Sequence, residues 1–297
     1  MTRPLSAVAI RAACRHCAAA TVAIEVVEAT GSTSADLMAR AAPGAALSAP
    51  SAALAGPTLL VARRQTAGRG RAGRTWLSTA GSLTFSLAWR FEQPLSALIG
   101  LPLAIGVAVA EVLNAQGAGA RLKWPNDVLV DGAKLAGILI ETVDLPTLLQ
   151  PQAWAVIGVG ININLDADEQ SPVDAPGAFS MAAQQDLQPL PATAVAVLPA
   201  TDRNLLLARL LDAFCVTLAD FDAHGMAPFL GRWNGLHAHA GRMVDIFERG
   251  TMVRSGRALG IDAMGRLLLK TGGDTLVVLA GDVSLRPSRE RSDAAVD

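Results

Sequence analysis

The sequence lacks an excess of either charge. Its 25 lysines and arginines oppose 26 aspartates and glutamates, so the formal net charge is −1 at pH 7. The chain as a whole therefore has no general attraction to nucleic acid or to a membrane surface, and any basic patch must be local. It also lacks a run of about 18 strongly apolar residues free of charge and proline, the length that spans a membrane. We expect a protein without a membrane span and without DNA binding.

The N-terminus lacks the continuous apolar stretch of a signal peptide. Arg3, Arg11, Arg15 and His16 interrupt the apolar residues of the first segment. Since an uninterrupted apolar centre is what marks a secreted chain, we expect a cytoplasmic location.

Cysteine is scarce, with only Cys14, Cys17 and Cys215 in the chain. The first two form a C-x-x-C pair that in principle binds zinc or acts as a redox couple. No second pair of ligands follows, and Cys215 is distant in the sequence. The favoured interpretation is that Cys14 and Cys17 are reduced cysteines on an N-terminal helix, and we assign them no chemistry.

The length of 297 residues suits roughly two domains of about 150 residues. Apolar periodicity and Gly/Pro punctuation predict a mixed α/β region followed by a small all-β region. A long excursion rich in proline, alanine and glutamine, with a short helix near residues 180–186, is expected at 166–201. The strands are predicted at 21–27, 58–62, 82–89, 120–123, 128–130, 135–143 and 155–164, with helices at 35–42, 98–116, 204–224 and 226–234. The short β segments of the C-terminal part are predicted at 243–248, 252–261, 267–270, 275–278 and 283–285.

Residues 68–76, the sequence GRGRAGRTW, combine three arginines, three glycines and a tryptophan between two predicted strands. We call them the arginine loop. Glycines let a backbone approach a ligand closely, and guanidinium groups match carboxylate or phosphate oxygens. The loop therefore predicts an anion site, although a solvated basic loop would have the same composition.

Two further segments carry polar or glycine-rich patterns. Ser32, Thr33 and Ser34 precede a predicted helix, where hydroxyls cap free backbone amides and those amides favour an anionic or carbonyl-bearing ligand. Capping alone would also explain them. Gly158 and Gly160 resemble part of a dinucleotide fingerprint, but no third glycine opens a helix at the required spacing, which argues against a Rossmann domain.

Four motifs in order resemble the biotin protein ligases. They are GST at 31–33, KWPND at 123–127, KLAGILIE at 134–141 and GVGININ at 158–164, and the arginine loop lies between the first two. The resemblance runs from about Glu28 to Asn164 with nearly the family spacing, and SLR at 284–286 resembles the family's final strand. It implies an N-terminal extension at 1–27, a mixed-sheet catalytic domain of the biotin/lipoate ligase type at 28–236, and an SH3-like barrel with a tail at 237–297.

The resemblance implies that ATP activates biotin to biotinyl-5′-adenylate and that the biotinyl group then passes to a lysine of a biotin carboxyl carrier protein. Because two anions must meet in the first half, cationic donors and a divalent ion are the expected tools. Lys134, Arg69 and Arg71 would be the catalytic residues. The residues implied for biotin are Ser32, Thr33, Ser34, Gln65, Gly68, Arg69, Gly70, Arg71, Lys134 and Gly137. Ser34 replaces an asparagine that is frequent in the family.

A second group is implied for ATP and Mg²⁺. Asp127 would contribute an oxygen ligand to the metal, as suits a hard cation. The residues implied for the nucleotide are Arg71, Arg74, Trp76, Asn126, Asn162 and Arg286. The resemblance further implies that the arginine loop orders when ligand binds.

Only about 27 residues precede the region of resemblance, too few for the winged helix-turn-helix of bifunctional family members, so we expect a monofunctional ligase. The alternatives are a lipoate-protein ligase and a non-enzymatic biotin sensor. The sequence leaves monomer and homodimer open, because an exposed sheet edge could pair with a carrier or with a second copy.

Overall fold

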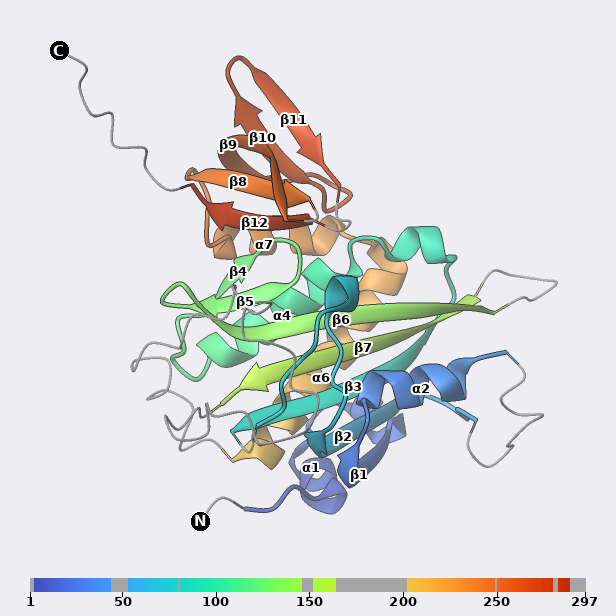
Figure 1. Ribbon diagram of the computed structural model, residues 1–297. Coiled ribbons are helices and arrows are strands. Elements are labelled where there is room, and N and C mark those ends of the chain that lie inside the picture. The colour runs from blue at the N-terminus through green and yellow to red at the C-terminus, as the bar shows by residue number, and fades with distance from the viewer. Residues whose placement is uncertain are drawn as a thin grey trace.

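A seven-stranded mixed sheet forms the larger part of the molecule (Figure 1). The computed structural model describes residues 3–43, 53–79, 81–145, 152–163, 202–248, 250–279 and 283–288. The predicted excursion at 166–201 and its short helix lie outside the described residues, as does Asn164. In spatial order the strands are β1 (Ala23–Thr30), β2 (Thr58–Gln65), β3 (Ser82–Phe91), β7 (Gln152–Asn162), β6 (Ala133–Leu145), β5 (Asp127–Val130) and β4 (Arg121–Lys123).

The sheet is mixed because one pair of strands is parallel. β1 and β2 run parallel, and the intervening chain crosses over through helix α2 (Thr33–Ala41), as a parallel connection requires. The other neighbours pair antiparallel. β1 begins at Ala23, so the domain boundary predicted after residue 27 falls inside this strand. The N-terminal segment is therefore a structural part of the sheet domain.

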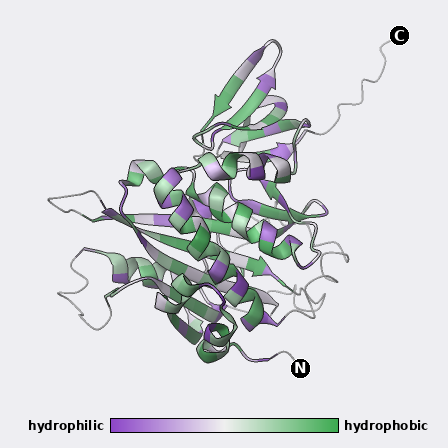
Figure 2. Ribbon diagram, turned by 180° about the vertical axis from the view of Figure 1, so that it is seen from behind, coloured by the Kyte–Doolittle hydropathy of each residue, from purple (hydrophilic) through white to green (hydrophobic). Residues whose placement is uncertain are grey.

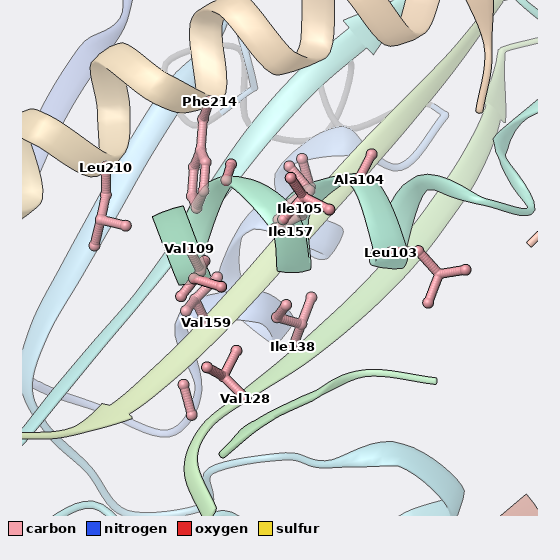
Figure 3. Packing of buried hydrophobic residues seen from close by; sticks show 14 of the residues in the cluster. Leu103, Ala104, Ile105, Val109, Val128, Ile138, Ile157, Val159, Leu210 and Phe214 are labelled. Carbon is pink, nitrogen blue, oxygen red and sulfur yellow. The ribbon is translucent and has the colours of Figure 1, made fainter. Parts of the chain in front are cut away.

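The two faces of the sheet have different neighbours. Helices α4 (Leu101–Asn114) and α6 (Arg203–His224) cover one face of the sheet, which is toward the viewer in Figure 2. Helix α2 lies on the other face. Strand side chains alternate between the faces, so Ile157 and Val159 of β7 and Ile138 of β6 point to the α4 side. Figure 3 shows these residues packed with α4 and with Phe214 of α6.

Residues Leu95–Asn114 are long and apolar enough to cross a membrane by length and composition. Most of this segment, which includes α4 and the preceding 3₁₀ turn η3 (Leu95–Leu98), is buried between the sheet and α6. Gly106 of α4 faces β4, where an added Cβ would make an ordinary contact with Leu122 at 3.4 Å. The burial of this segment identifies it as a core helix.

A five-stranded antiparallel sheet follows the 3₁₀ turn η6 (Ala227–Phe229) and helix α7 (Leu230–Leu236). This is the small β domain that the sequence predicted. It contacts the larger sheet through the indole N–H of Trp124, which donates to the carbonyl of Gly265 at 3.1 Å, and through Ala238, whose N–H donates to the carbonyl of Leu122 at 2.8 Å. Its strands, in spatial order, are β11 (Asp274–Val278), β10 (Leu267–Thr271), β9 (Thr251–Ile261), β8 (Met243–Glu248) and β12 (Val283–Pro287).

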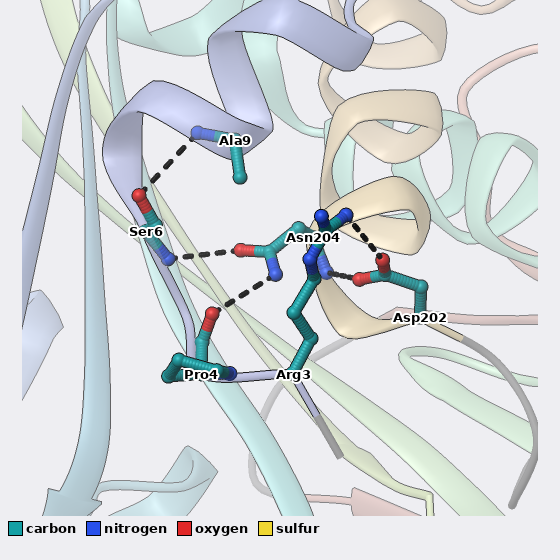
Figure 4. Close-up of polar contacts among 6 residues, drawn as sticks. All are labelled: Arg3, Pro4, Ser6, Ala9, Asp202 and Asn204. Carbon is teal, nitrogen blue, oxygen red and sulfur yellow. Dashed lines mark hydrogen bonds and ion pairs between the residues drawn. The ribbon is translucent and has the colours of Figure 1, made fainter. Parts of the chain in front are cut away.

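The N-terminal segment is attached to the start of α6 (Figure 4). The Asn204 side chain accepts from the N–H of Ser6 at 2.9 Å and donates to the carbonyl of Pro4 at 3.1 Å. Helix α1 (Ala7–Ala13) follows and packs on α6. The prediction that Cys14 and Cys17 lie on this helix was wrong. The helix ends at Ala13, the backbone at Cys14 is extended, and Cys17 begins the 3₁₀ turn η1 (Cys17–Thr21).

Candidate active site

A cavity opens on the α2 side of the sheet, opposite α4 and α6. It lies where the N-terminus of α2 and the arginine loop meet β3, β6 and β7. The empty space within and above it is about 450 Å³. Its lining residues are Ser32, Thr33, Ser34, Gln65, Arg69, Gly70, Arg71, Trp76, Thr84, Phe85, Ser86, Asn126, Lys134, Gly137, Ile138, Leu139, Gly158, Val159 and Gly160.

Glycines form the floor of the cavity. Alternation places Gly158 and Gly160 of β7 on the open face, while their neighbours in the strand point into the core. A Cβ on Gly158 would lie 2.4 Å from the Ser34 hydroxyl oxygen, and one on Gly160 would lie 2.3 Å from the Trp76 indole. Only glycine therefore lets α2 and the loop lie this close to the sheet. The sequence argument did not predict this role for Gly158 and Gly160, although glycines at alternate positions of a buried strand were the available signal.

A cluster of buried hydroxyls forms one end of the cavity. The Oγ of Ser86 lies 2.7 Å from the Thr33 hydroxyl and 2.9 Å from the Ser34 hydroxyl. The side-chain oxygen of Gln65 accepts from both the N–H and the hydroxyl of Thr33, at 2.8 and 3.0 Å. Ser32 caps α2, as its oxygen accepts from the N–H of Ala35 at 3.4 Å. Because their mutual bonds use only part of their capacity, these groups can also bind a polar ring.

Ser86 is a site residue that the sequence argument missed. It is fully buried in β3 and its hydroxyl joins the two α2 residues, so it fixes their position. The signal was a polar residue at every second position of an otherwise apolar strand. Ser82, Thr84 and Ser86 alternate with Leu83 and Phe85, as expected where one face borders a polar cavity.

The arginine loop is a short hairpin that covers the cavity. The N–H of Trp76 donates to the carbonyl of Gly68 at 2.9 Å, and the N–H of Gly70 donates to the carbonyl of Arg74 at 2.7 Å. A 3₁₀ turn, η2 (Arg71–Gly73), forms its tip, where Ala72 and Gly73 have positive φ values of 54° and 71°. Glycine adopts this conformation at little cost.

Side chains tie the loop to the sheet at three points. Arg69 forms an ion pair with Glu141 of β6 at 2.7 Å, and Arg71 donates to the side-chain oxygen of Asn126 at 3.1 Å. The indole of Trp76 lies over Gly160, and its buried N–H has no hydrogen-bond partner among the described residues. The predicted residues Arg69, Arg71 and Trp76 are thus brought together over the cavity.

Lys134 lies at the cationic end of the cavity. Its ammonium is 2.7 Å from one carboxylate oxygen of Asp127 and 6.0 Å from the centre of a Trp76 ring. Lys123 approaches the other Asp127 oxygen at 3.7 Å. The predicted catalytic lysine therefore faces the loop, held by a carboxylate that also contacts a second lysine.

The neighbours of Asp127 bear on its predicted role as a Mg²⁺ ligand. Both of its oxygens face ammonium groups, and the described part of the chain holds no cluster of three or more histidine, cysteine, aspartate or glutamate side chains suited to a metal. Mg²⁺ commonly takes one or two carboxylates and completes its shell with phosphate oxygens and water. The arrangement thus shows no metal site built from protein side chains alone, and the role of Asp127 as a ligand stays a prediction.

Five predicted residues do not line the cavity, namely Gly68, Arg74, Asp127, Asn162 and Arg286. Arg74 donates to the carbonyl of Arg71 at 3.3 Å on the outside of the loop. Asn162 is buried at the end of β7, where its oxygen lies 3.4 Å from the Ser82 hydroxyl. The Arg286 guanidinium lies 4.7 Å from the centre of the Phe247 ring within the small domain. A nucleotide role for these three residues is not tested by the structure.

The cavity as a whole offers two chemically different ends. Gly137 of β6 and Gly160 of β7 are paired and form one row across the two strands, and Leu139 and Gly158 form another. The two rows are two residues apart, which is about 7 Å along the strands. The hydroxyl cluster adjoins the Gly158 row and Lys134 adjoins Gly137. Such a site fits a ligand with a polar ring at one end and a carboxylate at the other.

Comparisons with known proteins point to one family. The model of the biotin/lipoate A/B protein ligase family matches residues 44–162, and that of the biotin protein ligase C-terminal domain matches residues 239–286. The chain is 36% identical over 269 residues to the biotin–[acetyl-CoA-carboxylase] ligase of Mycobacterium tuberculosis, covering 88% of each protein. It is 38% identical over 232 residues to the bifunctional ligase/repressor BirA of Escherichia coli, covering 77% of this chain and 67% of that protein. The biotin protein ligase of Aquifex aeolicus in complex with biotin and ATP has a TM-score of 0.67 at 26% identity, covering 90% of this chain and 99% of that one.

Proposed function

The chain belongs to the biotin protein ligase family, and we infer that its cavity carries out both halves of biotin ligation. In the first half, a carboxylate oxygen of biotin attacks the α-phosphorus of ATP, which forms biotinyl-5′-adenylate and releases pyrophosphate. In the second half, the amine of a lysine on a carrier protein attacks the acyl carbon, an amide bond forms, and AMP leaves. The relatives' names support the carboxyl carrier of acetyl-CoA carboxylase as the acceptor.

The observation that carries this proposal is the pairing of a hydroxyl cluster with a cationic end across a glycine floor. Thr33, Ser34 and Gln65 would hydrogen-bond the ureido ring, because they place donors and acceptors at one buried end. Lys134 and Arg71 would bind the carboxylate and then the phosphate, since both lie at the other end. The apolar chain between them would lie along Gly160 and the Trp76 indole.

Charge neutralisation is the main contribution of these residues to the first half. Two anions repel until fixed cations offset their charge, and groups already in place need no reorganisation as the bond forms. Asp127 holds the Lys134 ammonium, which keeps that charge directed at one position. Bound Mg²⁺ would neutralise further charge on the triphosphate. Asn126 connects the two parts of the site, as it accepts from Arg71 and donates to the carbonyl of Ile138 at 2.8 Å.

The direct test is incubation with biotin, ATP, Mg²⁺ and a biotin carboxyl carrier domain, followed by intact mass measurement of the carrier. The expected result is a gain of one biotinyl group on one lysine. A carrier that stays unmodified while the chain remains folded would refute the proposal. Replacing biotin with lipoate in the same assay tests the runner-up, because a lipoate ligase would release pyrophosphate with lipoate and not with biotin.

Location and assembly belong to the proposal as well. The metabolic role of the relatives and the burial of the Leu95–Asn114 segment support a soluble enzyme, and we propose that it works in the cytoplasm. A carrier would bring its lysine to the mouth of the cavity beside the arginine loop. Whether a second copy pairs along a sheet edge is measurable by sedimentation.

A further inference from the structure

Glu141 is a charged residue beside the cavity for which the reaction described above has no role. It lies on β6 two residues beyond Leu139 and four beyond Gly137, and strand alternation puts all three on the face that the arginine loop covers. It does not line the main cavity. Instead it borders a second hollow, between the tip of the loop and β6, that Arg69, Leu139 and the loop backbone also line.

The carboxylate of Glu141 has one partner in the described part of the chain. Its Oε1 pairs with the Arg69 guanidinium at 2.7 Å, whereas its Oε2 is buried and has no hydrogen-bond partner among the described residues. The Glu141 side chain is 20% exposed and that of Arg69 is 48% exposed. A largely buried carboxylate that loses its single cationic partner is destabilising, and opening of the loop would separate Arg69 from Glu141. The ion pair therefore opposes opening.

The position of Arg69 makes this pair relevant to the reaction. Arg69 lines both the main cavity and the second hollow, so its backbone forms part of the cover while its side chain reaches β6. The loop is also fixed at its tip, where Arg71 donates to Asn126. The pair formed by Arg69 and Glu141 is therefore a separate attachment of the cover to the sheet.

We propose that Glu141 is a positioning residue that holds the arginine loop closed over the cavity by pairing with Arg69. This role rests on the proposed function, since a closed loop retains the reactive adenylate until a carrier lysine arrives. Glu141 contacts neither substrate in this scheme. Its loss would raise the rate at which the loop opens, and the adenylate would escape and acylate lysines of other proteins.

A test that needs no catalysis is limited trypsin digestion, because the loop carries cleavage sites after Arg71 and Arg74. In Glu141→Gln without ligands, cleavage at these two sites should rise by about two- to fivefold, the range expected for loss of a partly exposed ion pair. The matched control is Glu111→Gln, which breaks a 2.6 Å pair with Arg232 on the far side of the sheet. The control should keep the wild-type cleavage rate in the loop.

A double-mutant cycle then separates a positioning role from general destabilisation. In an Arg69→Gln background, Glu141→Gln should have no further effect on loop cleavage or on labelling of a bystander protein by escaped adenylate. In the single variant, bystander labelling should rise by a similar factor, and the KM for biotin should rise more than kcat changes. Equal loop cleavage in Glu141→Gln and wild type, slower adenylate escape, or additive effects in the cycle would overturn the proposal.

These outcomes are distinguishable from failure of the proposed function. If wild-type protein does not biotinylate the carrier, the ligase assignment fails, while the trypsin result still reports on the loop. If wild-type protein is active and Glu141→Gln behaves like Glu111→Gln, the role of Glu141 fails alone. Melting temperatures of all four variants show whether each one is folded before it is compared.

Discussion

Gly160→Ala should disrupt the site by displacing Trp76 while leaving the sheet intact. An added Cβ would lie 2.3 Å from Trp76 Cε2 and 2.4 Å from Cζ2, distances at which the indole must move. Gly160 itself lies near the end of β7, paired on both sides with Thr84 and Gly137, where alanine is sterically allowed, so the clash falls on the loop. Overpacking of this kind costs about 1–3 kcal/mol, which corresponds to roughly a 5- to 150-fold loss of the closed loop.

The assay for this prediction is biotin binding by calorimetry together with thermal unfolding. Biotin affinity should fall at least about fivefold, whereas the melting temperature should change little, because the loop absorbs the clash. Gly231→Ala is the matched control, since a Cβ there would contact nothing within 4 Å. Gly137→Ala should give a smaller loss, because its nearest neighbour is the flexible end of Lys134 at 3.2 Å.

The decisive result comes from removing the indole. In a Trp76→Ala background, Gly160→Ala should no longer weaken biotin binding, since the atoms with which its Cβ collides are gone. The affinity of Trp76→Ala alone sets the reference for that comparison. Wild-type affinity in the single variant Gly160→Ala, or an undiminished effect in the Trp76→Ala background, would refute the reasoning.

Three further predictions follow from the same contacts. Arg71→Gly should raise biotinylation of a bystander protein, because it removes a loop contact and a phosphate-facing charge, and unchanged labelling by avidin blot would count against it. Ser86→Ala should cost about 1–3 kcal/mol of stability and raise the KM for biotin, since it leaves buried hydroxyls without their shared partner, and urea unfolding with steady-state kinetics would show both. Burial lowers the pKa of His237 and of His239 from 6.5 to about 4, so both are neutral in the folded state. These two histidines should leave stability unchanged above pH 6.5, and between pH 6.5 and about 4 each should lower the folding constant by up to about tenfold per pH unit. A flat urea midpoint between about pH 7 and 5 would contradict this.

The sequence was sufficient for the fold because the local signals agree with the final pairing. Every predicted strand and helix outside the undescribed ranges is present, with ends shifted by a few residues. The α4 segment was predictable because its apolar residues recur at helical spacing and glycines follow its end. The error at Cys14 has a local cause. Nothing in an alanine-rich stretch marks where a helix stops when the stop is set by contact with another element, and here the N–H groups of Arg15 and His16 donate to Asp212 of α6.

The site was predictable to the extent that its residues occur in contiguous motifs. Lys134, Arg69, Arg71 and Gln65 line one cavity, and the roles that the resemblance implied for them stay predictions. Arg74 does not line this cavity, because its side chain donates back to the carbonyl of Arg71, and a sequence of closely spaced arginines gives no sign of that contact.

The ion-pair partner of Glu141 could not be predicted from the sequence. Glu141 is the last residue of a motif that the sequence analysis quoted, yet the motif gives no partner for it, since its partner Arg69 precedes it by 72 residues in the chain. Strand alternation puts Glu141 on the same face as Gly137, the register of β6 against β7 turns that face toward the cavity, and the hairpin of the arginine loop brings Arg69 over it. A one-residue shift in that register would turn Glu141 into the core and Ile140 toward the loop. The pairing that secures the cover of the cavity is thus a consequence of strand register, which the spacing of the motifs alone does not determine.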